Sequence, residues 1–311
     1  MNHRTLRVTI VDAFTRSPGH GNRAGVVTET AGLQRADMLA AARAVAASET
    51  VFVLPAGAGA DLGLRYFTPA TEVDFCGHAT VAAFHHLAET GQIAAEGRFT
   101  FECPAGKVEV EVEPLEDHRR VWIATPRWPW EQSPIPGPAL MDFLGGGAGM
   151  LDPKLPVSRT GSKILVPLAR RADLWSLSPR WDDLAAAGLG HEVLGFYVFT
   201  LDAEDRAHVA QGRFFAPAMG VREDPVTGSA SGPLAEYLVL HDVLALPAAG
   251  GTVRARVEQG DAMGKPGRVD LEVTGAPGRI DRVRVGGTAV TVMDGSLWPE
   301  RTLARSAGAA P

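Results

Sequence analysis

The chain repeats one pattern of residues in its two halves, and this repeat constrains the fold more than any other feature. The first copy reads RYFTPA at residues 65–70 and leads into CGHA at 76–79. The second copy reads RFFAPA at residues 213–218, 148 positions later, and leads into TGSA at 227–230. In each copy a strand-like block precedes a glycine turn and a helical pattern. Self-similarity at this distance predicts two similar halves rather than an array of short repeats.

Short apolar runs dominate the rest of the chain. Most are rich in valine and alternate with polar residues, which is typical of half-buried strands. Helical periodicity is confined to residues 35–47, 79–90 and 231–242. Strands outnumber helices and do not alternate regularly with them, so the pattern favours an α+β fold over a doubly wound parallel sheet. Strands are expected at residues 7–11, 51–54, 107–112, 164–166, 196–201, 282–285 and 290–293.

A proline-rich segment separates the two halves. Residues 124–138 contain five prolines, which remove backbone donors and interrupt regular elements. The segment predicts an N-terminal half at 1–125 and a C-terminal half at 126–311, and the last strand either stays in the second half or returns to the first. A long surface loop within one domain is the alternative. Residues 300–311 are predicted to be a tail without functional residues.

Charge and composition exclude several classes of protein. The net charge of −6 argues against a surface that binds nucleic acid, because such surfaces are basic. No apolar run approaches the 18 residues of a membrane span, and the N-terminus lacks the apolar core of a secretory signal. Two cysteines do not make a disulfide framework. We therefore expect a cytoplasmic protein without nucleic-acid or membrane partners.

The two glycine turns are candidate anion-binding sites. Backbone amides in the first turn of a helix have no intrahelical partner, and the helix dipole favours negative charge there. A glycine before the helix lets a ligand approach closely, so we expect Gly77 and Gly228 to face one another across a cleft that binds a small anionic substrate. His78 and Ser229 follow these glycines, and Asp224 precedes the second turn. Taken singly, Ser229 and Asp224 read more simply as caps or turn residues.

Nine sequence blocks resemble, in order, those of the PhzF-like (phenazine-biosynthesis isomerase-like) family. They span nearly the whole chain, which makes the resemblance specific. The blocks are VDAFT at 11–15, GN at 21–22, SETVFV at 48–53, RYFTP at 65–69, CGHAT at 76–80, EDPVTGSA at 223–230, QG at 259–260, MGKPGR at 263–268 and VGGTAV at 285–290.

This resemblance implies the fold and the general biology of the chain. The implied fold is diaminopimelate-epimerase-like, with two similar α+β halves, each a curved, barrel-like sheet around a central helix. The active site of such proteins lies between the halves. The resemblance also implies a homodimer and a biosynthetic role, and an activity that needs neither a metal nor an organic cofactor.

The resemblance also assigns roles to individual residues. Its acid–base glutamate falls on Glu49, and its other catalytic positions fall on His78 and Asp224. The substrate carboxylate would be bound at the two turns, by Gly77, Gly228, Ser229 and Ala230.

The implied reaction is a proton shift on a small, carboxylate-bearing substrate. In the family reaction, a proton leaves one carbon of a hydroxylated cyclohexadiene amino acid and arrives at another, and one carboxyl group serves both steps. Such a group needs a pKa closer to neutrality than that of an exposed glutamate. We expect Glu49 to lie at a helix-to-strand junction, where burial raises its pKa.

Metal and thiol chemistry receive less support from the sequence. The repeat aligns Cys76 with Thr227, whose hydroxyl is too weak an acid for a two-thiol epimerase mechanism. Cys76 is predicted to be a small packing residue, with a role in the pocket left open. His85 and His86 point in different directions on a helix and have no nearby ligand set, so we expect no zinc there.

Two other functions stay open. One is an amino-acid epimerase or racemase that uses Glu49 or Cys76 with Asp224 as the opposing base. The other is a non-catalytic protein that binds a small molecule on the same scaffold. The family resemblance assigns no metabolic pathway, and the physiological substrate does not follow from the sequence.

Overall fold

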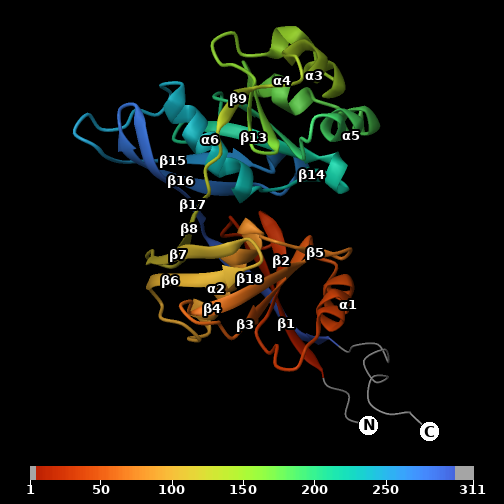
Figure 1. The fold of residues 1–311 in the computed structure, drawn as a ribbon, viewed down its shortest axis with the longest axis vertical. Coiled ribbons are helices and arrows are strands. Elements are labelled where there is room, and N and C mark those ends of the chain that lie inside the picture. The colour runs from red at the N-terminus through yellow and green to blue at the C-terminus, as the bar shows by residue number, and fades with distance from the viewer. Residues whose placement is uncertain (1–4, 298–311) are drawn as a thin grey trace. The chain divides into compact units, whose positions relative to one another are not determined.

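The chain folds into two compact units, which are described separately below (Figure 1). The structure is a computed structural model that describes residues 5–297; the predicted tail at 300–311 lies outside the described residues. The first unit comprises the residues up to Ile123 and those from Thr288 onward, and the second comprises Ala124–Gly287. The C-terminal strand thus belongs to the first unit.

A curved, mostly antiparallel sheet forms the first unit. Its strands pair side by side in the order β18, β1, β2, β3, β4, β6, β7 and β8, and the short β5 pairs with β4. Only β2–β3 and β4–β6 are parallel among these pairs. The elements are β1 Leu6–Ala13, β2 Asn22–Val27, α1 Arg35–Val45, β3 Glu49–Leu54, β4 Leu62–Phe67, β5 Glu72–Val73, α2 Gly77–Glu89, β6 Gly97–Cys103, β7 Gly106–Pro114, β8 Arg119–Ala124 and β18 Ala289–Leu297.

The second unit repeats this arrangement. Its strands β11 and β12 are parallel, as are β13 and β15, at the places that correspond to β2–β3 and β4–β6. The elements are β9 Trp130–Gln132, α3 Gly137–Phe143, η1 Ala148–Met150, β10 Ser158–Thr160, β11 Lys163–Leu168, α4 Arg171–Ser176, α5 Trp181–Gly190, β12 Gly195–Thr200, β13 Ala210–Ala216, η2 Pro217–Met219, β14 Val221–Asp224, α6 Gly228–Leu240, β15 Gly251–Gln259, η3 Asp261–Met263, β16 Gly267–Ala276 and β17 Arg279–Gly287.

One buried helix lies at the centre of each unit. Helix α2 buries eleven of its thirteen residues and packs against β1, β2, β3 and β18. Helix α6 buries ten of thirteen and packs against β16 and β17. Both helices are apolar around most of their circumference, which is typical of helices in the core. The predicted fold class, an α+β protein with two similar halves around central helices, is confirmed.

Further helices cover part of the outer face of each sheet. In the first unit, Met38 of α1 packs with apolar residues of β1, β2, β3 and β4. In the second unit, α3, α4 and α5 contribute Leu140, Leu174 and Leu184 to a cluster that includes β11 and β12. Strands next to these helices are buried on both faces, as in β12, whose six residues are all buried. Strands β6 and β7 keep an exposed face.

Arg65 and Arg213, the first residues of the two repeated blocks, each form an ion pair with a glutamate on the next strand. In the first unit, Arg65 donates two hydrogen bonds to Glu72, at 2.7 and 2.8 Å. In the second unit, Arg213 donates two to Glu223, both at 2.8 Å. A planar guanidinium group matches a carboxylate in this paired geometry. Each pair fixes a short strand, β5 or β14, just before the glycine turn.

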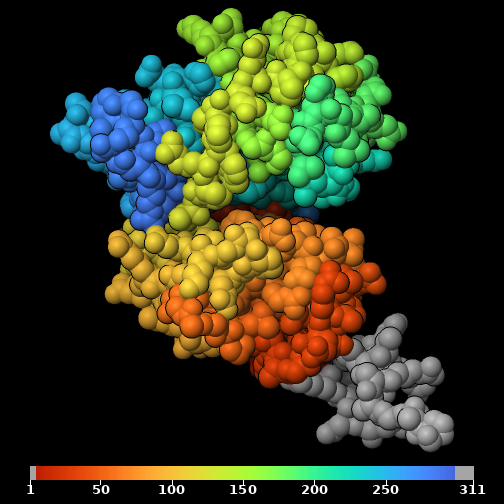
Figure 2. Space-filling model, in the orientation of Figure 1, coloured from red at the N-terminus to blue at the C-terminus, as the bar shows by residue number. Residues whose placement is uncertain are grey.

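The proline-rich segment is part of the second unit rather than a free connector. Arg127 donates hydrogen bonds to Glu236 on α6, and Thr125 donates to the carbonyl of Val283 on β17. Residues of this segment also form β9, which pairs with β10. In the space-filling view, this yellow stretch runs over the surface of the second unit (Figure 2).

Candidate active site

Glu49 lies where the first outer helix meets the sheet. Helix α1 ends at Val45, and Ala46 turns the chain with a left-handed backbone, φ 55°. Strand β3 then begins at Glu49, which pairs with Ala24 on the parallel strand β2. The predicted helix-to-strand junction is therefore present. The Glu49 side chain is 20% exposed, so its carboxyl group is mostly removed from water yet accessible to a ligand.

The structure brings Glu49 and His78 together. The Oε2 atom of Glu49 lies 3.3 Å from Nε2 of His78, whose side chain is buried in the first turn of α2. The hydroxyl of Ser48 lies 3.2 Å from the same nitrogen and donates to the backbone carbonyl of Arg23 at 2.9 Å. Burial raises the pKa of Glu49, and a hydrogen bond with Ser48 lowers it by less. The pKa of the carboxyl group is thus raised toward neutral pH.

The contact between Cys76 and His78 was not predicted from the sequence. The thiol of Cys76 lies 3.3 Å from Nδ1 of His78 and 3.9 Å from Nε2. Cys76 is the N-cap of α2, so its side chain and that of His78 leave the same turn. The thiol is buried, as predicted for a packing residue, but it also contacts one of the site residues. In the sequence, the only sign of this contact is that Cys76 and His78 are two residues apart at the start of a predicted helix.

The second turn is held by a glutamine that the sequence did not assign. The hydroxyl of Thr227, the N-cap of α6, donates to the Asp224 carboxylate. Gln259 accepts from the Thr227 amide at 3.1 Å and donates to the Asp224 carbonyl at 2.9 Å. Gln259 is completely buried, so it fixes the turn from within the unit. Its QG block was part of the resemblance, but nothing local in the sequence predicts this partner 32 residues away.

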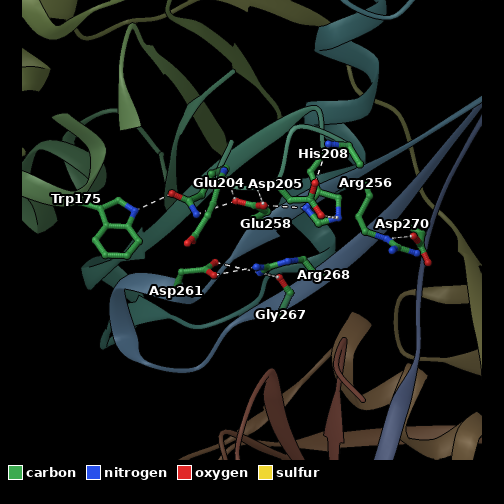
Figure 3. Close-up of polar contacts among 12 residues, drawn as sticks. Trp175, Glu204, Asp205, His208, Arg256, Glu258, Asp261, Gly267, Arg268 and Asp270 are labelled. Carbon is green, nitrogen blue, oxygen red and sulfur yellow. Dashed lines mark hydrogen bonds and ion pairs between the residues drawn. The ribbon is translucent and has the colours of Figure 1, made fainter. Parts of the chain in front are cut away.

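A buried carboxylate anchors the strand that carries Gln259. The neighbouring Glu258 has no exposed surface and accepts hydrogen bonds from the amides of Glu204 and Asp205, both at 2.9 Å. Nδ1 of His208 and Nε2 of Gln211 each lie 2.8 Å from its oxygens, and Figure 3 shows the network around Glu258. Burial raises the pKa of Glu258, but the hydrogen bonds outweigh it and the net pKa is lowered.

The remaining predicted binding residues lie at the two helix starts. Gly77 and Gly228 are the first residues of α2 and α6. Ser229 is exposed in the first turn of α6, and Ala230 is buried beside it. Amides in a first helical turn lack helical acceptors, so both turns present donors to an anion. The predicted convergence of the two turns on one substrate stays a prediction.

Other candidate sites have less support. Nε2 of His85 lies 3.8 Å from Glu89 and no metal-ligand set surrounds it within residues 5–297.

Across the same described stretch, no helix combines the length and apolar character that crossing a membrane requires.

The chain matches known proteins along nearly its whole length. The family model described as phenazine biosynthesis-like protein, PhzC-PhzF, matches residues 11–295. The Escherichia coli K12 protein named uncharacterized isomerase YddE is 37% identical over 290 residues, covering 90% of this chain and 94% of that protein.

Solved structures agree with this match. The crystal structure of the Bacillus anthracis phenazine biosynthesis protein of the PhzF family is similar with a TM-score of 0.87 at 29% identity, covering 94% of this chain and 99% of that one. A hydroxyproline epimerase from Agrobacterium vitis shares the fold, with a TM-score of 0.59 at 12% identity over 96% of this chain and 94% of that one. The curated relatives are named uncharacterized isomerases. The chain therefore belongs to the phenazine biosynthesis-like (PhzC-PhzF) family, as its motifs predict.

Proposed function

We propose that the chain is an isomerase that shifts a proton on a small, carboxylate-bearing substrate, with Glu49 as general acid and base. The observation that carries this proposal is the environment of the Glu49 carboxyl group. It is mostly buried, its pKa is raised, and it lies 3.3 Å from the imidazole of His78. Within the described chain, no lysine or arginine pairs with it to hold it permanently ionised. A carboxyl group in this state can accept a proton and return it.

The reaction needs only this group as proton carrier. The Glu49 carboxylate removes a proton from a substrate carbon, so that a C–H bond breaks and an O–H bond forms. The electron pair enters the adjacent conjugated system, and the double bonds shift. The carboxylic acid then protonates a different carbon, which restores the carboxylate. His78, 3.3 Å away, holds the carboxyl group in place during both steps.

The substrate carboxylate is assigned to the helix starts. We propose that first-turn amides at Gly77 and Gly228, with the hydroxyl of Ser229, bind it, and that Asp224 binds a polar hydrogen-bond donor of the substrate. The hydrogen bonds from Thr227 and Gln259 support this role, because they fix the Asp224 turn. Ala230 lies in the same first turn and its amide already donates to the Thr227 carbonyl at 3.1 Å, so we propose that it lines the site without a hydrogen bond to the substrate. The family resemblance further supports a cytoplasmic homodimer acting in biosynthesis; light scattering on the purified protein tests its dimeric state.

An epimerase is the second candidate, and Cys76 is the observation that favours it. Its thiol places a second ionisable group against His78. Epimerisation would invert one stereocentre and leave the double bonds unchanged, whereas the proposed shift moves a double bond. NMR spectra recorded during turnover in deuterated water distinguish these products.

The test uses a hydroxylated cyclohexadiene amino acid, the substrate type that the resemblance implies. We expect the protein to move its double bond and the Glu49→Gln variant to fail, because an amide cannot accept the proton. Glu96→Gln is the matched control, since Glu96 is an exposed carboxyl group of the same unit. Conversion of this probe by Glu49→Gln at the unaltered rate would refute the assignment.

A further inference from the structure

Ser48 precedes Glu49 in the chain and contacts two other elements of the first unit. Its hydroxyl donates to the backbone carbonyl of Arg23 at 2.9 Å and lies 3.2 Å from Oδ1 of Asn22, both on β2. The same oxygen lies 3.2 Å from Nε2 of His78 on α2. Ser48 thus connects the start of β2 with the imidazole that lies beside the Glu49 carboxyl group.

The hydroxyl of Ser48 has more acceptors within reach than it has hydrogens. A serine hydroxyl donates one hydrogen bond, and the Arg23 carbonyl and Oδ1 of Asn22 both accept. The Glu49 carboxylate is a further acceptor, since a hydrogen bond with Ser48 opposes the rise in the pKa of Glu49 that burial causes. The hydrogen therefore serves either β2 or Glu49, and only one of them at a time.

The protonation state of Glu49 decides which acceptor receives the hydrogen. An ionised carboxylate is a stronger acceptor than a neutral backbone carbonyl. The protonated acid is a weaker acceptor and has a hydrogen of its own to donate. Rotation of the Ser48 hydroxyl about its Cβ–Oγ bond moves the hydrogen between the Arg23 carbonyl and Glu49 without moving the oxygen. The donor therefore follows the charge of Glu49.

The charged groups around Glu49 leave Ser48 as the adjustable donor. His78 and Cys76 face Glu49 from α2. The arginines of the other elements beside β3 are bound by the carboxylates of Asp12 and Glu72 and by the carbonyl of Pro69; they are Arg23 on β2, Arg65 on β4, and Arg35 and Arg43 on α1. In the described chain, no lysine or arginine therefore forms an ion pair with the Glu49 carboxylate.

We propose that Ser48 is a positioning residue that gives its hydroxyl hydrogen to the ionised Glu49 carboxylate and returns it to the Arg23 carbonyl when Glu49 takes up a proton. Ser48 thereby stabilises the form of Glu49 that removes the substrate proton, and its contact with Nε2 holds His78 beside the carboxylate. No covalent bond of Ser48 changes. This role in turnover rests on the proposed function, whereas the effect of Ser48 on the ionisation of Glu49 does not.

Carbon-13 NMR titration of the Glu49 carboxyl carbon in the full chain tests the ionisation without any substrate. The resonance is assigned by its absence in Glu49→Gln. Ser48→Ala should raise the pKa of Glu49, because the ionised form loses a donor. Ser48→Thr keeps a hydroxyl and should restore the native titration. Ser296→Ala is the matched control, since it removes an exposed hydroxyl on β18 of the same unit, and it should titrate as the native protein does.

The pH dependence of turnover gives the second readout. The kcat/KM for the hydroxylated cyclohexadiene amino acid reports the ionisation of the base in the free enzyme. Because Ser48→Ala raises the pKa of Glu49, the ionised form is lost at a higher pH as the pH falls. In acid, kcat/KM relative to its alkaline plateau should therefore be at least about threefold lower than in the native protein. A purely structural role would lower the rate by the same factor at every pH.

Circular dichroism confirms that each variant is folded, and Ser48→Gly removes the same hydroxyl if Ser48→Ala does not fold. A Glu49 titration that is unchanged or shifted to lower pH in the folded variant would overturn the role of Ser48, as would a Ser48→Thr protein that titrates like Ser48→Ala. A shifted titration with an unshifted acidic limb would overturn the role in turnover alone. A shifted titration in Ser48→Ala, with no conversion of the probe by the native protein, would overturn the proposed function and support the effect of Ser48 on Glu49.

Discussion

The two units share one framework but carry different chemistry at matched positions. Their arginine–glutamate pairs and glycine turns coincide in type and in place along the chain. The first turns of the central helices also match: Thr80 donates its hydroxyl to the Cys76 carbonyl at 2.7 Å, and Ser231 donates to the Thr227 carbonyl at 3.0 Å. These shared residues build the turn, so they are not the ones that distinguish the two halves chemically.

At three matched positions of the two units, a carboxyl, thiol or imidazole group occurs in the first unit only. Thr50 pairs with Phe67 and Phe196 pairs with Phe215, so the strand that begins with Glu49 corresponds to the strand that begins with Gly195. Cys76 and His78 likewise correspond to Thr227 and Ser229. The turn proposed to bind the substrate therefore occurs in both units, whereas the carboxyl group proposed to transfer the proton occurs in one of them.

Two buried carboxyl groups show how the surroundings decide the role. Glu258 accepts hydrogen bonds from two backbone amides and from the side chains of His208 and Gln211, and its pKa is lowered. Glu49 lies beside one imidazole and one hydroxyl, and its pKa is raised by burial. A carboxylate with many donors stays ionised and stabilises the fold, whereas one with few donors can exchange protons.

The largest stability effect should follow from removing the Glu258 carboxylate. Glu258→Ala leaves four donors without an acceptor in a dry interior, so we expect a loss of about 3 kcal/mol in the free energy of unfolding. Chemical denaturation measures this loss, and hydrogen exchange should locate it in the second unit. A loss comparable to that of an exposed variant such as Glu96→Gln would contradict the contrast between the two carboxyl groups.

The two arginine–glutamate pairs should differ in strength. Arg213 also donates to the carbonyls of Leu174 and Leu177, so Arg213→Lys loses four hydrogen bonds and should cost about 2 kcal/mol. Arg65→Lys should cost about 1 kcal/mol or less, because Glu72 keeps its second partner, Arg35, at 2.8 Å. Denaturation of both variants in parallel gives the comparison, and equal losses would show that the two pairs are equivalent.

Gly195 should resist even a small side chain. A Cβ atom at this position would lie 2.2 Å from the ring of Phe214, so Gly195→Ala must displace that ring and should cost about 1 kcal/mol. Gly190→Ala is the control in the same unit, because its Cβ would meet no atom within 4 Å. If thermal unfolding shows the same small change for both, the matched strand tolerates a side chain and the asymmetry of Glu49 has another cause.

The smallest effect is a pH dependence of the second unit. Because the pKa of Glu258 in the folded protein is below its ordinary value of 4.5, its stabilising contribution is present above pH 4.5 and is lost as the pH falls through the folded pKa. The protection factors of the β15 amides, which are corrected for the intrinsic pH dependence of exchange, should therefore fall as the pH decreases in the native protein. Glu258→Gln should lack this added fall, and an identical pH profile would argue against the carboxylate as its source.

The sequence predicted those features that depend on local pattern. The strands around residues 7–11, 107–112 and 290–293, the central helices and the glycine turns all follow from periodicity and from the internal repeat. The contacts of Gln259 and Glu258 did not, because their partners lie far along the chain and come together only when the sheet forms. The contact of Cys76 with His78 needed the geometry of the helix start, which spacing alone does not specify.

The central claim is that Glu49 carries the proton, and single-turnover NMR with the hydroxylated cyclohexadiene amino acid tests it most directly. The account predicts that Glu49→Gln converts this probe at least about a hundredfold more slowly than the native protein. The variant should keep native amide protection in α2 and β3, and Glu96→Gln should convert the probe at the native rate. Unchanged conversion by a folded Glu49→Gln protein would contradict the account.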